Sequence, residues 1–242
     1  MKPKPDETYD SIKYIKLFQA KTGYRFSVDA LLLEDFIYCK SRCRGIELGA
    51  GSGIISMLLA KRNKNIKLTA VELQEPLAGC AEKNVKLNRL SNRIEVMNED
   101  IRNLKKIFPS GKFDFAFSNP PFRKTRSGRL STDEERAVAR HEIKITLPEL
   151  IDTAAYLIKN AGSFFMIYHP FRLVEVIVLL QKARLEPKRL RFVHSRAGEE
   201  AKMVLIEAVK GSGAWLKIAP PLYIYEKGSE YTAEMKKIYG EG

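Results

Sequence analysis

Phe115-Ala116-Phe117-Ser118-Asn119-Pro120-Pro121-Phe122 joins an apolar, strand-like run to an amide, two prolines and an aromatic residue. Proline has no N–H to donate to a ladder, so the chain must leave a sheet at Pro120. Asn119 therefore ends a strand, at the place where ligands bind in open α/β sheets. An amide oxygen beside a proline-fixed carbonyl suits holding a planar –NH2 group, and Phe122 suits stacking on a base. Without support from the rest of the chain, the same residues would also fit an ordinary turn.

Upstream, two further strand ends carry ligand-binding signals. Gly45-Ile-Glu-Leu-Gly-Ala-Gly-Ser-Gly53 runs directly into the apolar stretch 54–60, which predicts a short strand, a glycine-rich turn and a helix. Alternating glycines let the backbone approach a ligand closely, and the helix N-terminus aims free N–H groups at it. The next strand, Ile66 to Val71, ends at Glu72. An acid there can accept hydrogen bonds from both ribose hydroxyls of an adenosine.

The remaining pattern alternates strands with helices. It predicts a helix capped by Ser27, a helix with Pro76 in its first turn, and two later helices over 147–160, closed by Gly162, and 171–184. The predicted strands are 93–97 and 163–168, followed by an antiparallel pair formed by 189–194 and 201–209. Such alternation implies a mostly parallel, doubly wound α/β sheet with helices on both faces. We therefore expect one globular domain with an antiparallel edge strand.

Composition fits an ordinary globular protein: 242 residues, 45% hydrophobic and 29% charged. No apolar run reaches the roughly 18–20 residues that a membrane span needs, and residues 1–6 lack the apolar core of a signal peptide. The odd set Cys39, Cys43 and Cys80 offers no second pair to complete a zinc site. We expect reduced thiols, no metal and a cytoplasmic location.

The net charge of +13 favours a polyanionic partner, because lysines and arginines release counterions from phosphates. Solubility or adaptation to high temperature is the alternative explanation. The basic segment that begins at the predicted acceptor site contains Arg123, Lys124, Arg126 and Arg129 and no acid. These side chains are candidates for gripping the phosphates that flank a splayed-out base, and a solvated loop is the alternative.

The glycine pattern separates two nucleotide-binding classes. A dinucleotide fold needs Gly-x-Gly-x-x-Gly/Ala, but Gly51-Ser-Gly53-Ile-Ile-Ser56 has serine at the third position. The run Glu47-x-Gly49-x-Gly51-x-Gly53 instead resembles the first motif of the S-adenosylmethionine-dependent methyltransferases. Asn119-Pro-Pro-Phe122 resembles the fourth motif of the amino-group methyltransferases within that class.

Two further motifs narrow the resemblance. Gly23-Tyr-Arg-Phe-Ser-Val-Asp29 and Pro221-Leu-Tyr-Ile-Tyr-Glu-Lys-Gly-Ser-Glu-Tyr-Thr232 are similar to the bacterial valine tRNA adenine-N6 methyltransferases, and the similarity covers nearly the whole chain. It implies a Rossmann-like fold, S-adenosyl-L-methionine as cofactor, and tRNA as partner, methylated at the adenine beside the anticodon. It also implies that residues 1–40 cover the cofactor site and that residues 41–242 form the methyltransferase domain.

Roles follow from the resemblance by position. The cofactor-binding set that it implies is Phe26, Asp29, Glu47, Gly49, Gly51, Glu72, Leu73, Asp100, Ile101 and Asn119. Within that set Glu72 would bind the ribose hydroxyls and Asp100 the adenine amino group of the cofactor. Asn119 and the Pro120 carbonyl would hold the acceptor amine, with Phe122 stacking on the base. The oligomeric state is left open.

Other acceptors use closely similar fourth motifs. Ribosomal RNA guanine-N2 methyltransferases remain an alternative, whereas the release-factor glutamine methyltransferases usually carry an additional N-terminal helical domain that about 40 residues cannot supply. A different class is a non-catalytic RNA-binding module on the same fold. A nicotinamide oxidoreductase is disfavoured by the glycine spacing.

Overall fold

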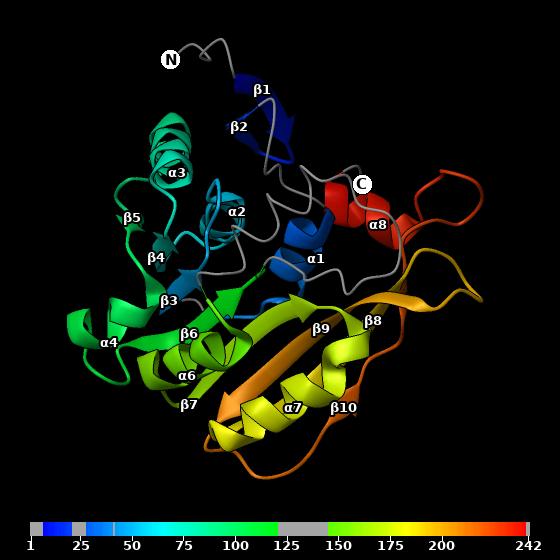
Figure 1. The fold of residues 1–242 in the computed structure, drawn as a ribbon. Coiled ribbons are helices and arrows are strands. Elements are labelled where there is room, and N and C mark those ends of the chain that lie inside the picture. The colour runs from blue at the N-terminus through cyan, green and yellow to red at the C-terminus, as the bar shows by residue number, and fades with distance from the viewer. Residues whose placement is uncertain (1–6, 21–27, 41, 121–144, 241–242) are drawn as a thin grey trace, which may run out of the picture.

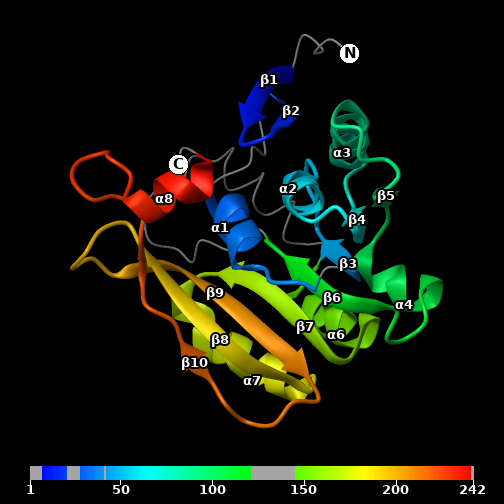
Figure 2. The ribbon, with the colours of Figure 1, turned by 180° about the vertical axis from the view of Figure 1, so that it is seen from behind.

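The protein is built on one large twisted sheet, seen in the computed structural model in Figure 1, which describes residues 7–20, 28–40, 42–120 and 145–240. The strand order is β10-β8-β9-β7-β6-β3-β4-β5, and β11 pairs with β8. Strands β3 to β7 are mutually parallel, and β9 runs antiparallel to both β7 and β8. Seen from behind, β9 lies between these two strands towards one end of the sheet (Figure 2). The mostly parallel α/β fold with an antiparallel edge is confirmed.

The strands of this sheet are β3 (Cys43–Leu48), β4 (Ile66–Glu72), β5 (Ile94–Asn98), β6 (Phe113–Ser118), β7 (Ile158–Tyr168), β8 (Leu185–His194), β9 (Ala201–Lys210), β10 (Lys217–Ile218) and β11 (Leu222–Tyr223). Their central members are covered on both faces, so nearly every residue of β3, β4 and β6 is buried. Parallel strands in this position read as continuous apolar runs rather than as alternating ones.

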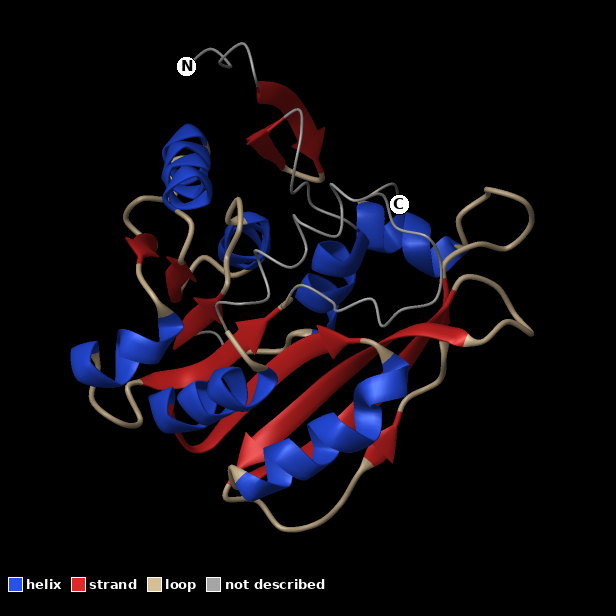
Figure 3. Ribbon diagram, viewed as in Figure 1, coloured by secondary structure: helices blue, strands red, loops and turns tan. Residues whose placement is uncertain are grey.

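Helices form a layer on each face of the sheet (Figure 3). One layer contains α1 (Val28–Phe36), α2 (Ile54–Arg62), α3 (Glu75–Leu87) and α8 (Ala233–Tyr239). The other contains α4 (Leu104–Ile107), α6 (Leu147–Leu157) and α7 (Leu173–Lys182), with the short 3-10 turns η1 (Ile101–Asn103) and η2 (Pro170–Arg172). Each layer has its own apolar core against the sheet. No helix in the described ranges is long and apolar enough to cross a membrane.

The expected helix over 147–160 is too long, because the chain changes to a strand at Ile158. Ile158 has extended backbone angles and pairs with Phe113 of β6. The register between β6 and β7 then shifts, and Ala161 has φ 60°. A Cβ on Gly162 would lie 2.7 Å from the Asp114 carbonyl oxygen. Gly162 therefore belongs to an irregularity inside β7 and does not close the helix.

A hairpin near the N-terminus, β1 (Glu7–Ile12) with β2 (Ile15–Ala20), is absent from the sequence-based expectations. It packs on α3, where two side-chain amides form the hydrogen bonds to the β2 backbone that a neighbouring strand would otherwise form. Asn84 accepts from the Phe18 N–H at 2.7 Å and donates to the Phe18 carbonyl at 3.0 Å, and Asn88 does the same for Lys16 at 3.0 and 2.6 Å. These bonds satisfy the backbone groups of β2 that would otherwise lack partners. The expected helix cap Ser27 lies outside the described residues.

Candidate functional site

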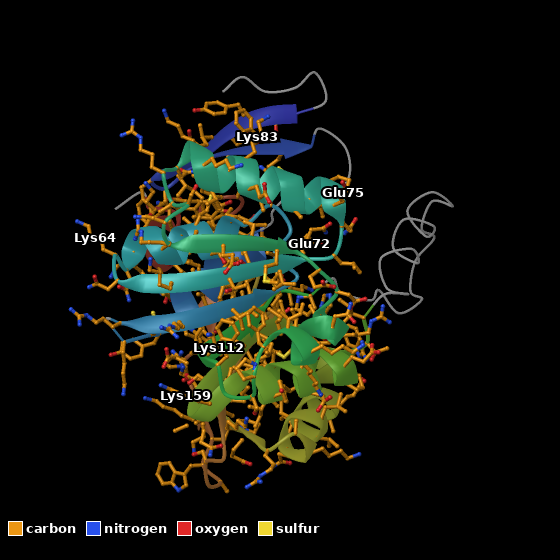
Figure 4. All side chains as sticks on the ribbon, turned by 90° about the vertical axis from the view of Figure 1, so that its left-hand side faces the viewer. Lys64, Glu72, Glu75, Lys83, Lys112 and Lys159 are labelled. Carbon is orange, nitrogen blue, oxygen red and sulfur yellow. The ribbon has the colours of Figure 1, made fainter. Side chains whose placement is uncertain are left out.

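Three chain segments meet at the carboxyl edge of the sheet, where β3 lies between β4 and β6. The glycine turn follows β3, Glu72 ends β4, and Asn119 follows β6. Figure 4 shows Glu72 towards one end of the strands and Lys64, Lys112 and Lys159 towards the opposite end. The fold thus brings together the three features that the sequence placed at strand ends.

The glycine turn has a backbone that only glycine adopts easily. Gly49, Gly51 and Gly53 have φ values of 81°, 54° and 79°. The N–H groups of Gly49 and Ala50 both donate to the Val71 carbonyl at 2.9 Å, which fixes the turn against β4. No described atom lies within 4 Å of the position that a Cβ on Gly49 would take. The turn therefore presents open space at its first glycine, ahead of the N-terminus of α2.

Glu72 points its carboxylate at this turn. It accepts from the Gly51 N–H at 2.8 Å and from the Gln74 N–H at 2.9 Å, and the residue is only 6% exposed. The Asn98 side chain donates to the Glu72 carbonyl at 2.9 Å and so pins the ends of β4 and β5 together. A carboxylate fixed in this way is preorganised to accept further hydrogen bonds from a ligand in front of the turn.

Glu47, at the end of β3, makes its hydrogen bonds with the start of α2. Its side chain is buried and accepts from the Ser56 hydroxyl at 2.5 Å and the Ser56 N–H at 3.2 Å, in the first turn of α2. Burial raises the pKa of Glu47 to about 8, against the lowering effect of the two Ser56 bonds. Glu47 therefore holds the glycine turn and the helix N-terminus in register as a buried, protonated acid at neutral pH.

Asp100 is occupied by a neighbouring arginine. Its carboxylate caps η1 by accepting from the Arg102 N–H at 2.9 Å, and it accepts from the Arg102 guanidinium at 3.0 and 2.5 Å. Ile101 beside it is 2% exposed, and Leu73 is half-buried at the end of β4. A ligand amine would have to share Asp100 with Arg102.

Asn119 carries an unsatisfied acceptor. Its Oδ1 atom is buried and has no hydrogen-bond partner among the described residues. The preceding Ser118 hydroxyl donates to the Leu48 carbonyl at 2.6 Å, which fixes the end of β6 beside β3. Leaving a buried oxygen without a hydrogen bond costs about 1–3 kcal/mol, and a catalytic or ligand-binding role is one of the reasons for which native structures keep such atoms.

Of the remaining predicted site residues, the structure describes only Asp29 and Pro120. Asp29 is half-buried in the first turn of α1, and Pro120 is half-buried at the end of the described segment. The rest lie outside the described residues: Phe26, Phe122, Arg123, Lys124, Arg126 and Arg129.

Sequence reasoning missed three polar residues that hold the site: Ser118, Asn98 and Asn84. Asn84 donates to the Ser52 carbonyl of the glycine turn at 3.1 Å as well as to β2, so it ties the N-terminal hairpin to the turn. Ser118 and Asn98 are each the last residue of a strand, and a polar residue in that position is the sequence feature that could have identified them. No cluster of potential metal ligands occurs in the described part of the chain.

A protein-family model described as "Methyltransferase small domain" matches residues 28–183, more than half of the chain. The chain belongs to this family. The match starts at α1 and ends after α7, so it contains the glycine turn, Glu72 and Asn119.

Individual proteins that are similar to this chain also carry methyltransferase names. A Porphyromonas gingivalis protein named tRNA1(Val) (adenine(37)-N6)-methyltransferase is 31% identical over 67% of this chain and 64% of its own length. A Photobacterium profundum protein of the same name is 25% identical over 88% of both chains. Among solved structures, a predicted O-methyltransferase from Agrobacterium tumefaciens superposes with a TM-score of 0.71 and 26% identity, over 87% of this chain and 95% of that one.

Proposed function

We propose that this protein transfers a methyl group from S-adenosyl-L-methionine to the exocyclic N6 of an unpaired adenine in tRNA, at the position beside the anticodon in valine tRNA. The observation that carries the proposal is the buried Oδ1 of Asn119, which has no hydrogen-bond partner in the described part of the chain and lies at the same sheet edge as the glycine turn and Glu72. The name borne by the Porphyromonas gingivalis and Photobacterium profundum relatives supports the choice of acceptor.

The residues present fit the cofactor. Open space at Gly49, a carboxylate at Glu72 and the N-terminus of α2 match a nucleoside with a charged amino-acid tail. Glu72 would bind the ribose, Gly49 and Gly51 would pass close to the tail, and Leu73 and Ile101 would flank the adenine with Asp100. When bound, the cofactor supplies an electrophilic methyl group on a sulfonium. Phe26 and Asp29 would close over it, as part of a covering segment formed by residues 1–40.

Two hydrogen-bond acceptors of the chain would help the adenine amino group, a poor nucleophile, to react. The lone pair of an adenine amino group is delocalised into the ring. Asn119 Oδ1 and the Pro120 carbonyl would accept its two N–H bonds and favour a pyramidal nitrogen with the lone pair free. The nitrogen becomes cationic as it is methylated, so two preorganised oxygens stabilise the developing charge. Phe122 would stack on the base and hold it in line, which supplies the proximity that such a transfer needs.

The basic residues Arg123, Lys124, Arg126 and Arg129 would grip the phosphates beside the extruded base. This role rests on their position in the sequence directly after the Asn-Pro-Pro-Phe stretch. The excess of positive charge over the whole chain would assist the encounter with RNA.

Nucleoside mass spectrometry tests the reaction. Transfer RNA from a strain that lacks the gene is incubated with the protein and S-adenosylmethionine and then digested to nucleosides. We expect N6-methyladenosine, and mapping of the tRNA should place it beside the anticodon of valine tRNA. N2-methylguanosine as the product, or label on a protein glutamine, would contradict the proposed acceptor while leaving the family assignment intact.

Glu72→Ala should weaken cofactor binding by about 1–3 kcal/mol, because charge-assisted hydrogen bonds to the ribose are lost. Titration calorimetry with S-adenosylhomocysteine measures the change. Glu72→Gln is the conservative variant, since an amide oxygen can still accept from the Gly51 N–H, and Glu75→Ala is the matched control because Glu75 is exposed in the first turn of α3. Wild-type affinity in a folded Glu72→Ala variant would remove Glu72 from the cofactor site.

A further inference from the structure

The turn that follows β7 lies beside the acceptor end of β6. The two strands are parallel, and Ser118 pairs with Met166. β6 ends at Ser118 and β7 ends two residues after Met166, at Tyr168, and adjacent strands lie about 4.8 Å apart. The segment His169 to Arg172 therefore begins at the rim of the site beside Asn119, whose Oδ1 has no hydrogen-bond partner among the residues that the structure describes.

This rim carries an exposed aromatic stack. The rings of His169 and Phe171 have centroids 5.2 Å apart and an interplanar angle of 25°, and Phe171 is 59% exposed. A stacked pair at the surface leaves the outer face of one ring available to a further flat group. The exposed Phe171 side chain makes this surface apolar.

The stack is fixed in place before any ligand arrives. Pro170 stands in the first turn of η2, and the Arg172 N–H donates to the His169 carbonyl at 3.2 Å. The His169 ring nitrogen Nδ1 lies 3.2 Å from the Lys202 carbonyl oxygen on β9, a hydrogen bond that sets the ring plane. A rigid aromatic surface costs little entropy on binding, which is the condition under which stacking adds affinity.

The turn ends at Arg172, whose guanidinium is paired with a carboxylate. Arg172 donates to the Tyr168 hydroxyl at 2.6 Å and to the Glu175 carboxylate at 2.8 and 2.6 Å. With that charge neutralised, the surface selects for a flat, weakly polar group rather than for a phosphate. In single-stranded RNA that group is a nucleobase, and stacking on an aromatic ring accepts any base.

We infer that Phe171, backed by His169, is a stacking platform for the unpaired nucleotide next to the methylated one. The inference rests on the proposed function, because it takes single-stranded RNA as the substrate. One aromatic residue, Phe122, is proposed to hold the target base, and Phe171 would hold its neighbour on the adjacent strand end. Holding two consecutive bases would keep the target base splayed from the stack of its loop.

The experiment uses an anticodon stem-loop RNA in which 2-aminopurine replaces the nucleotide on one side of the target adenine, and a second RNA with the replacement on the other side. Stacking on Phe171 should quench the fluorescence of one of the two RNAs on binding, with S-adenosylhomocysteine present. Phe171→Ala should abolish this quenching and weaken RNA binding about tenfold, as expected for the loss of one stacked base. Phe171→Trp should retain both.

Trp215→Ala is the matched control. Trp215 is 84% exposed and lies in the segment that follows β9. The last residue of β9 pairs with the first residue of β8, so this segment begins at the edge of the sheet opposite to the one that carries Phe171. The control variant should bind and quench like the wild type. The platform is contradicted if Phe171→Ala quenches the same RNA to the same extent as the wild type, if the wild type quenches neither RNA on binding, or if Trp215→Ala loses as much affinity as Phe171→Ala. A wild type that binds both RNAs but methylates guanine contradicts only the proposed acceptor, and one that binds neither RNA overturns both proposals.

Discussion

Asn119→Ala should lower the turnover number at least about a hundredfold and leave the affinity for S-adenosylhomocysteine unchanged. The buried Oδ1 has no partner among the described residues, so its removal should cost the folded protein little. In the reaction the same atom faces a nitrogen that becomes cationic, and one preorganised polar group at such a centre is worth about 2.7–4 kcal/mol in other enzymes. The loss should therefore appear in kcat under saturating RNA and cofactor.

Single-turnover methylation of valine tRNA measures this effect, with calorimetry as the check on the cofactor. Asn65→Ala is a suitable control, because Asn65 is an exposed asparagine beside the first residue of β4, at the far edge of the sheet. It should methylate at the wild-type rate. A wild-type rate for Asn119→Ala would contradict the mechanism, and an equal loss of cofactor affinity would move Asn119 from the acceptor to the cofactor.

The parts of the site that the sequence predicted are those with strong local signals. Proline ends β6, alternating glycines make the turn after β3, and an acid directly follows the apolar run of β4. Each signal acts within a few residues, because it comes from backbone conformations and hydrogen bonds that neighbours in sequence decide. The α/β order then brings the three strand ends to one edge without further information.

The parts that escaped prediction depend on partners far along the chain. Asn88 serves β2 from 72 residues away, and nothing near Lys16 indicates that a side-chain amide will complete the hairpin edge. The end of α6 at Leu157 is set by pairing between Ile158 and Phe113, which overrides the helical pattern of the next residues.

Glu47→Gln is expected to gain stability relative to the wild type as pH rises from 5.5 to about 8. The raised pKa of about 8 means that the folded protein holds a proton on Glu47 that the unfolded chain releases above about pH 4.5. Between these two values the folded state binds more protons, so the wild type loses stability with rising pH at about 1.4 kcal/mol per pH unit. Below pH 4.5 both states are protonated and this contribution is fully present.

Urea unfolding at intervals from pH 5.5 to 8.5 separates this effect from simple packing. Glutamine keeps an oxygen that can accept from the Ser56 N–H and hydroxyl, so the variant should lack the wild-type slope and differ from it by on the order of 3 kcal/mol more at the upper end than at the lower. Glu149→Gln is the matched control, because hydrogen bonds from Thr146 lower the pKa of Glu149, and its effect on stability should be constant over this range. A constant offset for Glu47→Gln as well would mean that the Glu47 carboxyl is ionised in the folded protein. A growing offset would show that Glu47 is buried as the neutral acid, because it is desolvation that disfavours the carboxylate, whereas the two hydrogen bonds donated by Ser56 favour it.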